Sequence, residues 1–501
     1  MSPADPHPPS AHLAMATAAE IAADLAAGHT TSVVVTRTLL DRIEALDGPG
    51  AFHLRAVLAL APDALDAAER LDAERATGHI RGPLHGVPVL VKDNIEAVGL
   101  PGTAGSLALA DRTVTRDAPL VARLREAGLV VLGATNLSEW ANIRSSRSTS
   151  GWSAVGGLTG NPWALDRSAG GSSSGSGAAV AGGLTPLAIG TETDGSITCP
   201  SSLNGCVGLK PTVGLLPTRG IVPISGSQDA PGPMTRSVYD AALLLDALTG
   251  ASHYGAACGT ETVSLTDVRL AVADAWLSGH PATDALFAAT LDTLREHGSR
   301  AAGVMVPGSE TLEPDELLVL LGELQTDLDA YLSTRPGRGP ASLADVVAFN
   351  REHAADELSH FGQELLEQAL TTGGRAATEY REARARNLDQ VLRGCLEPVF
   401  AGADAPDLLI APAYAPAWKS DLVNGDASIG GGLASAAPSI AGWPVLCLPM
   451  GLVDGLPVGL VLIGQANSEA KLLAIGHAIE TALDLRSSGG LTPTWSPPTR
   501  G

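Results

Sequence analysis

Two serines and one lysine have the residue types that hydrolysis of an amide or ester requires. Ser172 lies in the run AGGSSSGSGAAVAGG, and Ser196 lies downstream in GTETDGSITCP. A serine hydroxyl needs a base to become a nucleophile, and this region contains no histidine. Lys92, in the apolar stretch VPVLVKDN, can be that base, because burial favours a neutral amine. The tight Asp194-Gly195 pair before Ser196 could direct N–H groups at an oxyanion.

The Gly/Ser run at residues 169–183 has other interpretations, which the residues alone leave open. Such a run is typical of a flexible linker. A phosphate-binding loop would need a lysine after its last glycine, and a dinucleotide-binding loop would need glycine where Val180 stands. Ser173 satisfies the G-x-S-x-G pattern of a nucleophile elbow, although NPWALDRSAGG before it is not predicted to be a strand. Lys92 could likewise be a salt-bridged lysine with a structural role.

Helical and strand patterns alternate along the chain. Helices are predicted over AAEIAADLAAG, TSVVVTRTLLDRIEAL (with Thr31 or Ser32 as N-cap), PDALDAAERLDAERATG and PLVARLREAG. Short runs rich in β-branched residues predict strands over GVPVLVKD and LVVLGATN, and DLLIAPAYAP and PVGLVLIGQA also have strand character. The alternation predicts an α/β fold. Because residues from about 310 to 400 are helical and charged, we expect one domain over residues 1–501 with a helical insertion.

Composition argues against several classes of protein. The net charge of −22 argues against nucleic-acid binding, for which a basic face is expected. The five cysteines are scattered without a Cys-x-x-Cys pair, so neither a disulfide framework nor a cysteine zinc site is expected. The start MSPADPHPPSAHLAMATAAE lacks the features of a signal peptide, and no stretch reaches about 20 uninterrupted apolar residues. We expect a cytoplasmic protein that does not bind membranes.

Three segments resemble the landmark segments of the amidase signature family. They are GPLHGVPVLVKDNI, AGGSSSGSGAAVAGG and GTETDGSITCPSSLNGCVGLKPTVG. The resemblance continues through PISGSQDAPGPMTRSVYDAALLLDALTG to GWPVLCLPMGLVDGLPVGLVLIGQ, so it covers roughly residues 15–485. It implies a single α/β/α domain around a central mixed sheet, with the helical insertion near the substrate pocket, a Ser-cisSer-Lys triad and no cofactor.

Position by position, the resemblance gives a role to each catalytic candidate. Ser196 would be the nucleophile, Ser172 the bridging serine after a cis peptide bond, and Lys92 the base that receives the proton. The N–H groups of the oxyanion hole would be those of Thr193, Asp194, Gly195 and Ser196 itself. On this interpretation the Gly/Ser run is no linker, because its glycines let the backbone pack closely around a proton relay.

The serine motif departs from the commonest family pattern, Thr-Asp-x-Gly-Gly-Ser-Ile-Arg. Asp194 replaces a glycine and Thr198 replaces the arginine. These departures resemble the sequences of bacterial peptide amidases, which remove the C-terminal amide of peptides. The same subgroup is resembled by three further segments, SGWSAVGGLTGNPW, FNREHAADELSHFGQE and PAWKSDLVNGD. They imply a small-molecule or short-peptide amide substrate and no obligatory protein partner. The alternatives are a broad aryl-amide or carbamate hydrolase of the same family and an amidotransferase-type subunit, which would need partner chains.

Four further residues are candidates for the substrate pocket. They are Trp152, Gln228, Asp229 and Trp418. The alternative for the two tryptophans is packing in the core, and for the other two it is a structural turn. His353 and His360 lie two turns apart in the helical segment. Because a metal site would prefer histidines at i and i+4 with a third ligand, no metal is expected there.

Overall fold

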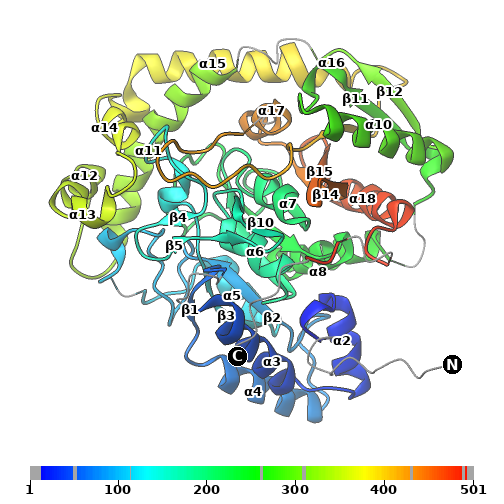
Figure 1. Ribbon diagram of the computed structural model, residues 1–501, viewed down its shortest axis with the longest axis horizontal. Helices are drawn as coiled ribbons and strands as arrows, with labels where there is room; N and C mark the ends of the chain where they lie inside the picture. Colours follow the sequence, from blue (N-terminus) through cyan, green and yellow to red (C-terminus); the bar gives the residue numbers. More distant parts are fainter. Residues whose placement is uncertain are drawn as a thin grey trace.

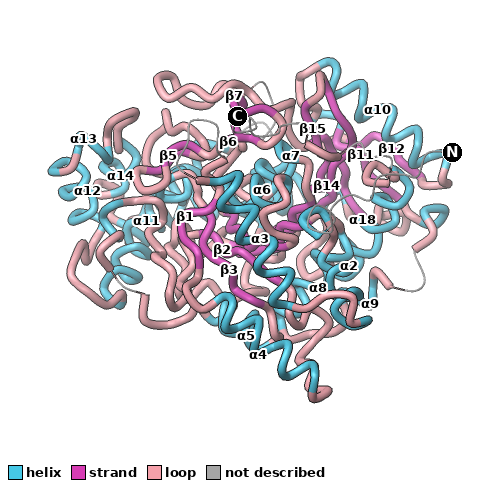
Figure 2. The backbone as a smooth tube through the Cα atoms, turned by 60° about the horizontal axis from the view of Figure 1, so that its bottom comes forward, coloured by secondary structure: helices cyan, strands magenta, loops and turns pink. Residues whose placement is uncertain are grey.

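A computed structural model describes residues 13–48, 54–112, 114–259, 263–306, 312–428, 433–487 and 491–493. The first twelve residues, for which the sequence predicts no signal peptide, lie outside this set. An eleven-stranded sheet crosses the protein (Figures 1 and 2). Its strands run from edge to edge in the order β1 (Val57–Leu60), β3 (Val130–Thr135), β2 (Pro88–Lys92), β8 (Leu187–Glu192), β10 (Ala230–Thr235), β9 (Val207–Lys210), β14 (Val445–Val453), β15 (Leu456–Ile463), β13 (Leu408–Pro412), β11 (Arg269–Ala273) and β12 (Arg300–Val304).

Parallel and antiparallel pairs occur in separate parts of this sheet. β2 pairs in parallel with β3 and β8, and β11 pairs in parallel with β12 and β13. The pairs that connect β8 to β13 through the middle of the sheet are antiparallel. Since β2 and β8 run in the same direction, their C-terminal ends lie at the same edge of the sheet. The predicted α/β fold with a central mixed sheet is confirmed.

Helices surround the sheet (Figure 1). Outside the segment between β12 and β13, the longer helices are α2 (Ala18–Ala27), α3 (Ser32–Asp47), α4 (Ala64–Ala76), α5 (Pro119–Glu126), α6 (Ser174–Ala181), α7 (Thr198–Asn204), α8 (Val238–Thr249), α10 (Pro281–Glu296), α17 (Leu433–Ala441) and α18 (Glu469–Leu483). The predicted helices α2 to α5 are confirmed, and Thr31 is the N-cap of α3, since its Oγ1 accepts the Val34 N–H at 3.2 Å.

Both faces of the sheet are buried against helices. On β14, Val445 and Cys447 belong to an apolar cluster that includes residues of α17. The alternate residues Leu446 and Leu448 belong to a larger core that includes residues of α18. Because successive side chains of a strand point to opposite faces, each face of the sheet has its own core.

Between β12 and β13 the chain forms a layer of helices at the top and upper left of Figure 1. These are α11 (Glu313–Thr334), α12 (Leu343–Glu352), α13 (Ala354–Glu357), α14 (Glu364–Ala369), α15 (Thr378–Val391) and α16 (Glu397–Val399). A buried ion pair ties the layer to the rest of the protein, because Arg144 Nη1 lies 3.6 Å from Glu357 Oε2. The Ser106 hydroxyl also donates to Glu357 Oε1 at 2.9 Å. Residues 310 and 311 of the predicted insertion lie outside the described residues.

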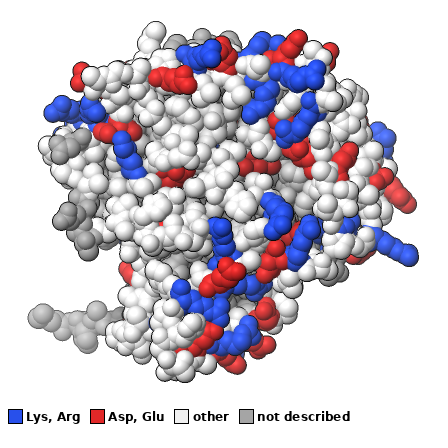
Figure 3. All heavy atoms as spheres, turned by 180° about the vertical axis from the view of Figure 1, so that it is seen from behind, with Lys and Arg blue, Asp and Glu red and all other residues white. Residues whose placement is uncertain are grey.

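The surface carries both signs of charge. On the face shown in Figure 3, Lys and Arg side chains are interspersed with Asp and Glu. No helix in the described part of the chain combines the length and apolar character needed to cross a membrane. The five cysteines are free and buried.

Candidate active site

Lys92 is the last residue of β2 and lies fully buried between β3 and β8. Its Nζ donates to Ser172 Oγ at 2.8 Å, to Thr191 Oγ1 at 2.9 Å and to the Thr191 carbonyl at 3.2 Å. An ammonium group has three protons, so each has an acceptor when the lysine is charged. When the lysine is neutral, it has a lone pair that can take a proton from a neighbouring hydroxyl.

Burial sets the charge state of this lysine. Loss of hydration lowers the pKa of Lys92 to about 7, although the carboxylates of Asp229 and Glu192 oppose the shift. In a substantial fraction of the molecules the Lys92 side chain is therefore neutral at neutral pH. Its partners are hydroxyls and a carbonyl, which differs from the salt-bridged structural lysine that the sequence left open.

The Gly/Ser run folds into the centre of the protein. Residues 174–181 form the buried helix α6, so the run is not a linker. The peptide bond between Gly171 and Ser172 is cis. A Cβ on Gly171 would lie 2.3 Å from Ser138 Oγ, so only glycine fits this close approach. Before the run lies a strand that the sequence did not predict, β7 (Ala164–Ser168), but it is partly exposed in a two-stranded ribbon and is not the buried strand of a nucleophile elbow.

Ser196 lies in the turn between β8 and α7 and is 8 % exposed. The Glu192 carboxylate holds this turn by accepting the N–H groups of Ile197 at 2.6 Å and Thr198 at 2.8 Å. The Ser173 N–H donates to the Ser196 carbonyl at 3.1 Å. This bond joins the segment that carries Ser172 to the one that carries Ser196.

The residues before Ser196 form a tight turn. Gly195 has φ +76°, and a Cβ there would lie 2.5 Å from the Tyr414 hydroxyl, so both conformation and space require glycine. The Thr193 hydroxyl donates to Asp229 Oδ1 at 2.6 Å. The Thr193 carbonyl accepts from Gln228 Nε2 at 3.3 Å. Hydrogen bonds to the side chains of Gln228 and Asp229 therefore hold this turn in place.

The four pocket candidates occupy different places. Asp229 lines a small pocket together with Asn94, Thr191 and Thr193, and burial raises its pKa to about 6. Gln228 is fully buried. The other two are not among the residues that line this pocket: Trp152 contacts Arg144, His360 and Phe361, and Trp418 packs in an apolar cluster with Tyr414 and donates from Nε1 to Asp426 Oδ1 at 3.0 Å.

Sequence reasoning missed three neighbours of the catalytic candidates. Thr191 provides two of the acceptors for Lys92, and Asn94 Nδ2 donates to Thr191 Oγ1 at 3.0 Å. Tyr414 packs against Gly195. A signal existed for Thr191 and Asn94, since each lies within five residues of a candidate in the same motif. Tyr414 had none, because it is distant in the sequence.

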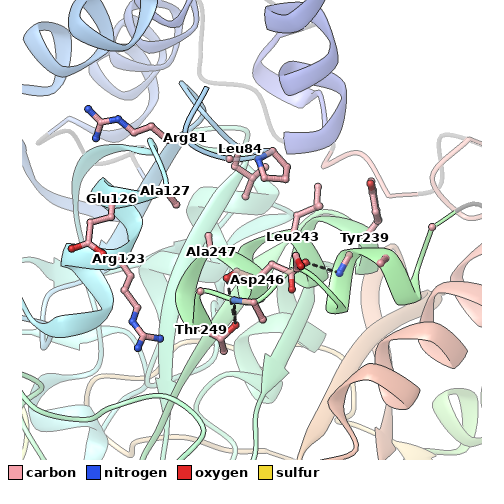
Figure 4. A pocket seen from close by; sticks show the side chains of 18 residues that line it. Arg81, Leu84, Arg123, Glu126, Ala127, Tyr239, Leu243, Asp246, Ala247 and Thr249 are labelled. Carbon is pink, nitrogen blue, oxygen red and sulfur yellow. Dashed lines mark hydrogen bonds between the residues drawn. The ribbon is translucent and has the colours of Figure 1, made fainter. Parts of the chain in front are cut away.

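A wider pocket lies elsewhere, with a volume of about 770 Å³ (Figure 4). Its wall includes Arg81 and Leu84, which precede β2, and Leu243 and Asp246 of α8. Lys92 is at the opposite end of β2. The catalytic candidates therefore do not line this pocket. Among the described residues, no group of three or more His, Cys, Asp or Glu side chains is placed to hold a metal ion.

Comparison with known proteins decides the family. A family model described as Amidase matches residues 34–473. The chain belongs to the amidase signature family. The amidase is similar in structure to the native peptide amidase from Stenotrophomonas maltophilia, with 42 % sequence identity, a TM-score of 0.90, and coverage of 97 % of this chain and 100 % of that one.

Two other relatives are more distant from this amidase. An amidase family protein from Bacillus anthracis str. Ames is 27 % identical, with a TM-score of 0.84, over 97 % of this chain and 94 % of that one. A glutamyl-tRNA(Gln) amidotransferase subunit from Salinispora arenicola is 34 % identical over 93 % of this chain and 97 % of its own length. The predicted likeness to bacterial peptide amidases is confirmed.

Proposed function

We propose that this amidase hydrolyses the C-terminal amide of peptides to a free carboxylate and ammonia, through an acyl-enzyme on Ser196. The observation that carries the mechanism is the hydrogen bond between buried Lys92 and Ser172. The observation that carries the substrate is the 42 % identity to a peptide amidase over nearly the whole chain.

The reaction begins with attack of Ser196 Oγ on the amide carbonyl carbon. The Ser196 proton passes to Ser172, and the Ser172 proton passes to neutral Lys92. The new oxyanion accepts hydrogen bonds from N–H groups of residues 193–196. When the C–N bond breaks, the proton returns along the same path to the nitrogen, and ammonia leaves.

Water completes the cycle by attacking the acyl-enzyme. Lys92 again receives a proton through Ser172, and a second oxyanion forms. Its collapse breaks the bond to Ser196 Oγ, which regains its proton, and the peptide leaves as the carboxylic acid, which ionises to the carboxylate as the released ammonia takes up the proton. The cycle consumes one water and needs no cofactor.

A substrate panel tests the proposal with the purified chain alone. Ammonia release is measured for short C-terminally amidated peptides, the same peptides as free acids and free glutamine, and release of the aniline or amine is measured for anilides and carbamates. We expect the amidated peptides to have the highest kcat/KM and internal peptide bonds to stay intact. Faster hydrolysis of anilides or carbamates would replace the proposal with the broad-specificity alternative.

A second candidate is an amidotransferase-type subunit, which the 34 % identity to the Salinispora arenicola protein favours. Glutamine is the informative member of the panel here. If the chain hydrolyses glutamine but not amidated peptides, or is active only with added partner chains, this second candidate is correct.

A further inference from the structure

Gln228 connects the turn before Ser196 to the helical layer. Its Nε2 donates to the Thr193 carbonyl at 3.3 Å and to Glu316 Oε1 of α11 at 2.8 Å. Both partners are acceptors, so the NH₂ end of the amide must face them. Among the described residues, Gln228 Oε1 is buried without a hydrogen-bond partner.

Both hydrogen bonds of the side chain come from its amide NH₂ group, and leucine, of similar size, could make neither of them. The two donated hydrogen bonds therefore indicate what the side chain does. It holds the Thr193 carbonyl in place.

The orientation of that carbonyl fixes a second group. The bond between Thr193 and Asp194 is not among the cis peptide bonds of the described chain. In a planar trans peptide the C=O and the N–H point in opposite directions. With the Thr193 carbonyl held on Gln228, the Asp194 N–H points away from Gln228.

The segment that carries Gln228 is itself held by α11. Glu323 Oε2 accepts the Ser225 hydroxyl at 2.7 Å and the Ser227 N–H at 3.0 Å. Asp327 Oδ2 accepts the Gly226 N–H at 2.8 Å. Together with the Gln228–Glu316 bond, these contacts fix residues 225–228 to the helical layer at four points.

We propose that Gln228 is a positioning residue that aims the Asp194 N–H at the oxyanion, and that Glu316 acts through Gln228. The inference rests on the proposed function, in which that N–H belongs to the oxyanion hole. Loss of one oxyanion donor costs about 10²–10³ in kcat. A donor that is present but poorly aimed should cost less, about 10–100-fold.

The first test is Gln228→Leu, with Gln363→Leu as the matched control. Gln363 is another buried glutamine of the helical layer, and it bonds to Val347 and Glu367. We expect Gln228→Leu to lower kcat about 10–100-fold with KM within about threefold, since the lost interaction exists only in the transition state. Gln363→Leu should lower the melting temperature and leave kcat unchanged.

An inhibitor that forms an oxyanion distinguishes a misplaced Asp194 N–H from general structural damage to the site. A peptide aldehyde adds to the nucleophile and forms a tetrahedral oxyanion, whereas the free-acid product does not. For Gln228→Leu, the Ki of the aldehyde should rise by the same factor as kcat/KM falls, and the Ki of the product should stay within about threefold. Equal weakening of both ligands would overturn the positioning role.

A double-mutant cycle tests the part of Glu316. Glu316→Leu should reduce kcat in the same direction as Gln228→Leu but less, and Glu316→Gln, which keeps a carbonyl acceptor, should restore most of the rate. The double variant should match Gln228→Leu alone, because Glu316 acts through it. Fully additive losses, or a folded Gln228→Leu with kcat within twofold of wild type, would overturn the inference. If Ser196→Ala is inactive and amidated peptides remain the preferred substrates in the same experiments, the proposed function stands even then.

Discussion

Lys92 and Lys210 are two buried lysines, each the last residue of a strand in the same sheet, and they differ in what surrounds the amine. Burial lowers the pKa of Lys92 to about 7 and that of Lys210 to about 8. Lys92 Nζ contacts two hydroxyls, whereas Lys210 Nζ donates to the carbonyls of Trp443 at 2.6 Å and Pro211 at 3.4 Å. A carbonyl has no proton to give. A depressed pKa therefore marks a base only where a hydroxyl is within reach.

The largest expected effect tests whether the hydroxyls beside Lys92 lead to a nucleophile. Ser196→Ala should lower kcat/KM for amide hydrolysis by about 10⁴-fold or more, as removal of a catalytic serine does elsewhere. Ser173→Ala is the control for the nucleophile-elbow interpretation and should retain activity. A folded Ser196→Ala enzyme with a tenth of wild-type activity would contradict the assignment, and an inactive Ser173→Ala beside it would support the elbow.

Replacing each of the two lysines by methionine, in separate variants, tests directly whether they differ in function. Lys92→Met should lose about 10³-fold or more in kcat/KM because no base remains. Lys92→Arg should fail as well, since a guanidinium stays protonated. Lys210→Met should keep kcat/KM within about threefold once circular dichroism shows that it is folded. Similar losses for Lys92→Met and Lys210→Met would show that burial of a charge, and not its contact with hydroxyls, matters.

The pH dependence of kcat/KM tests whether Lys92 is the base that titrates. Lys92 must be neutral to accept a proton, so activity should fall about tenfold per pH unit below its pKa of about 7 and level off above it. Asp229 and Glu192 are the carboxylates that raise this pKa. Asp229→Asn should therefore move the midpoint of the limb to lower pH, whatever its effect on the maximal rate. A limb unchanged in Asp229→Asn would mean that another group titrates.

The smallest expected effect is on stability. In the unfolded chain Lys92 stays protonated up to the ordinary lysine pKa of 10.5, but in the folded protein it loses its proton near pH 7. Between these values the unfolded state binds more protons, so Lys92 makes the free energy of unfolding rise with pH, by a few kcal/mol in total. Urea unfolding from pH 6.5 to 9.5 should show this rise in wild type and a smaller one in Lys92→Met. Lys210→Met should lose a smaller share, because the pKa of Lys210 is nearer its ordinary value; identical slopes in all three proteins would refute the pKa difference.

The candidate site could be proposed from the sequence because its parts lie in short motifs. Residue types make Lys92 and Ser196 candidates, the family resemblance gives them roles, and periodicity predicts the strand that ends at Lys92. The contact of Lys92 with Thr191 was not predictable, because it depends on β8 lying beside β2, and pairing order is set by the whole sheet. The same holds for Gln228 and α11, which the chain brings together across 88 residues. The sequence pattern predicts where helices and strands lie, whereas which of them become neighbours depends on the packing of the whole protein.

The row of acidic side chains on α11 has a consequence for chimaeric enzymes. Glu323 accepts from Ser225 and Ser227 on one side and from Tyr380 at 2.6 Å on the other. If the helices of residues 313–399 were moved into a relative without the segment 225–228, Glu323 would keep the donors Arg375 and Tyr380 but lose Ser225 and Ser227, and losing hydrogen bonds at a buried carboxylate is costly. The transferable unit is therefore discontinuous: the helices of residues 313–399 and the short segment 225–228 have to be exchanged together.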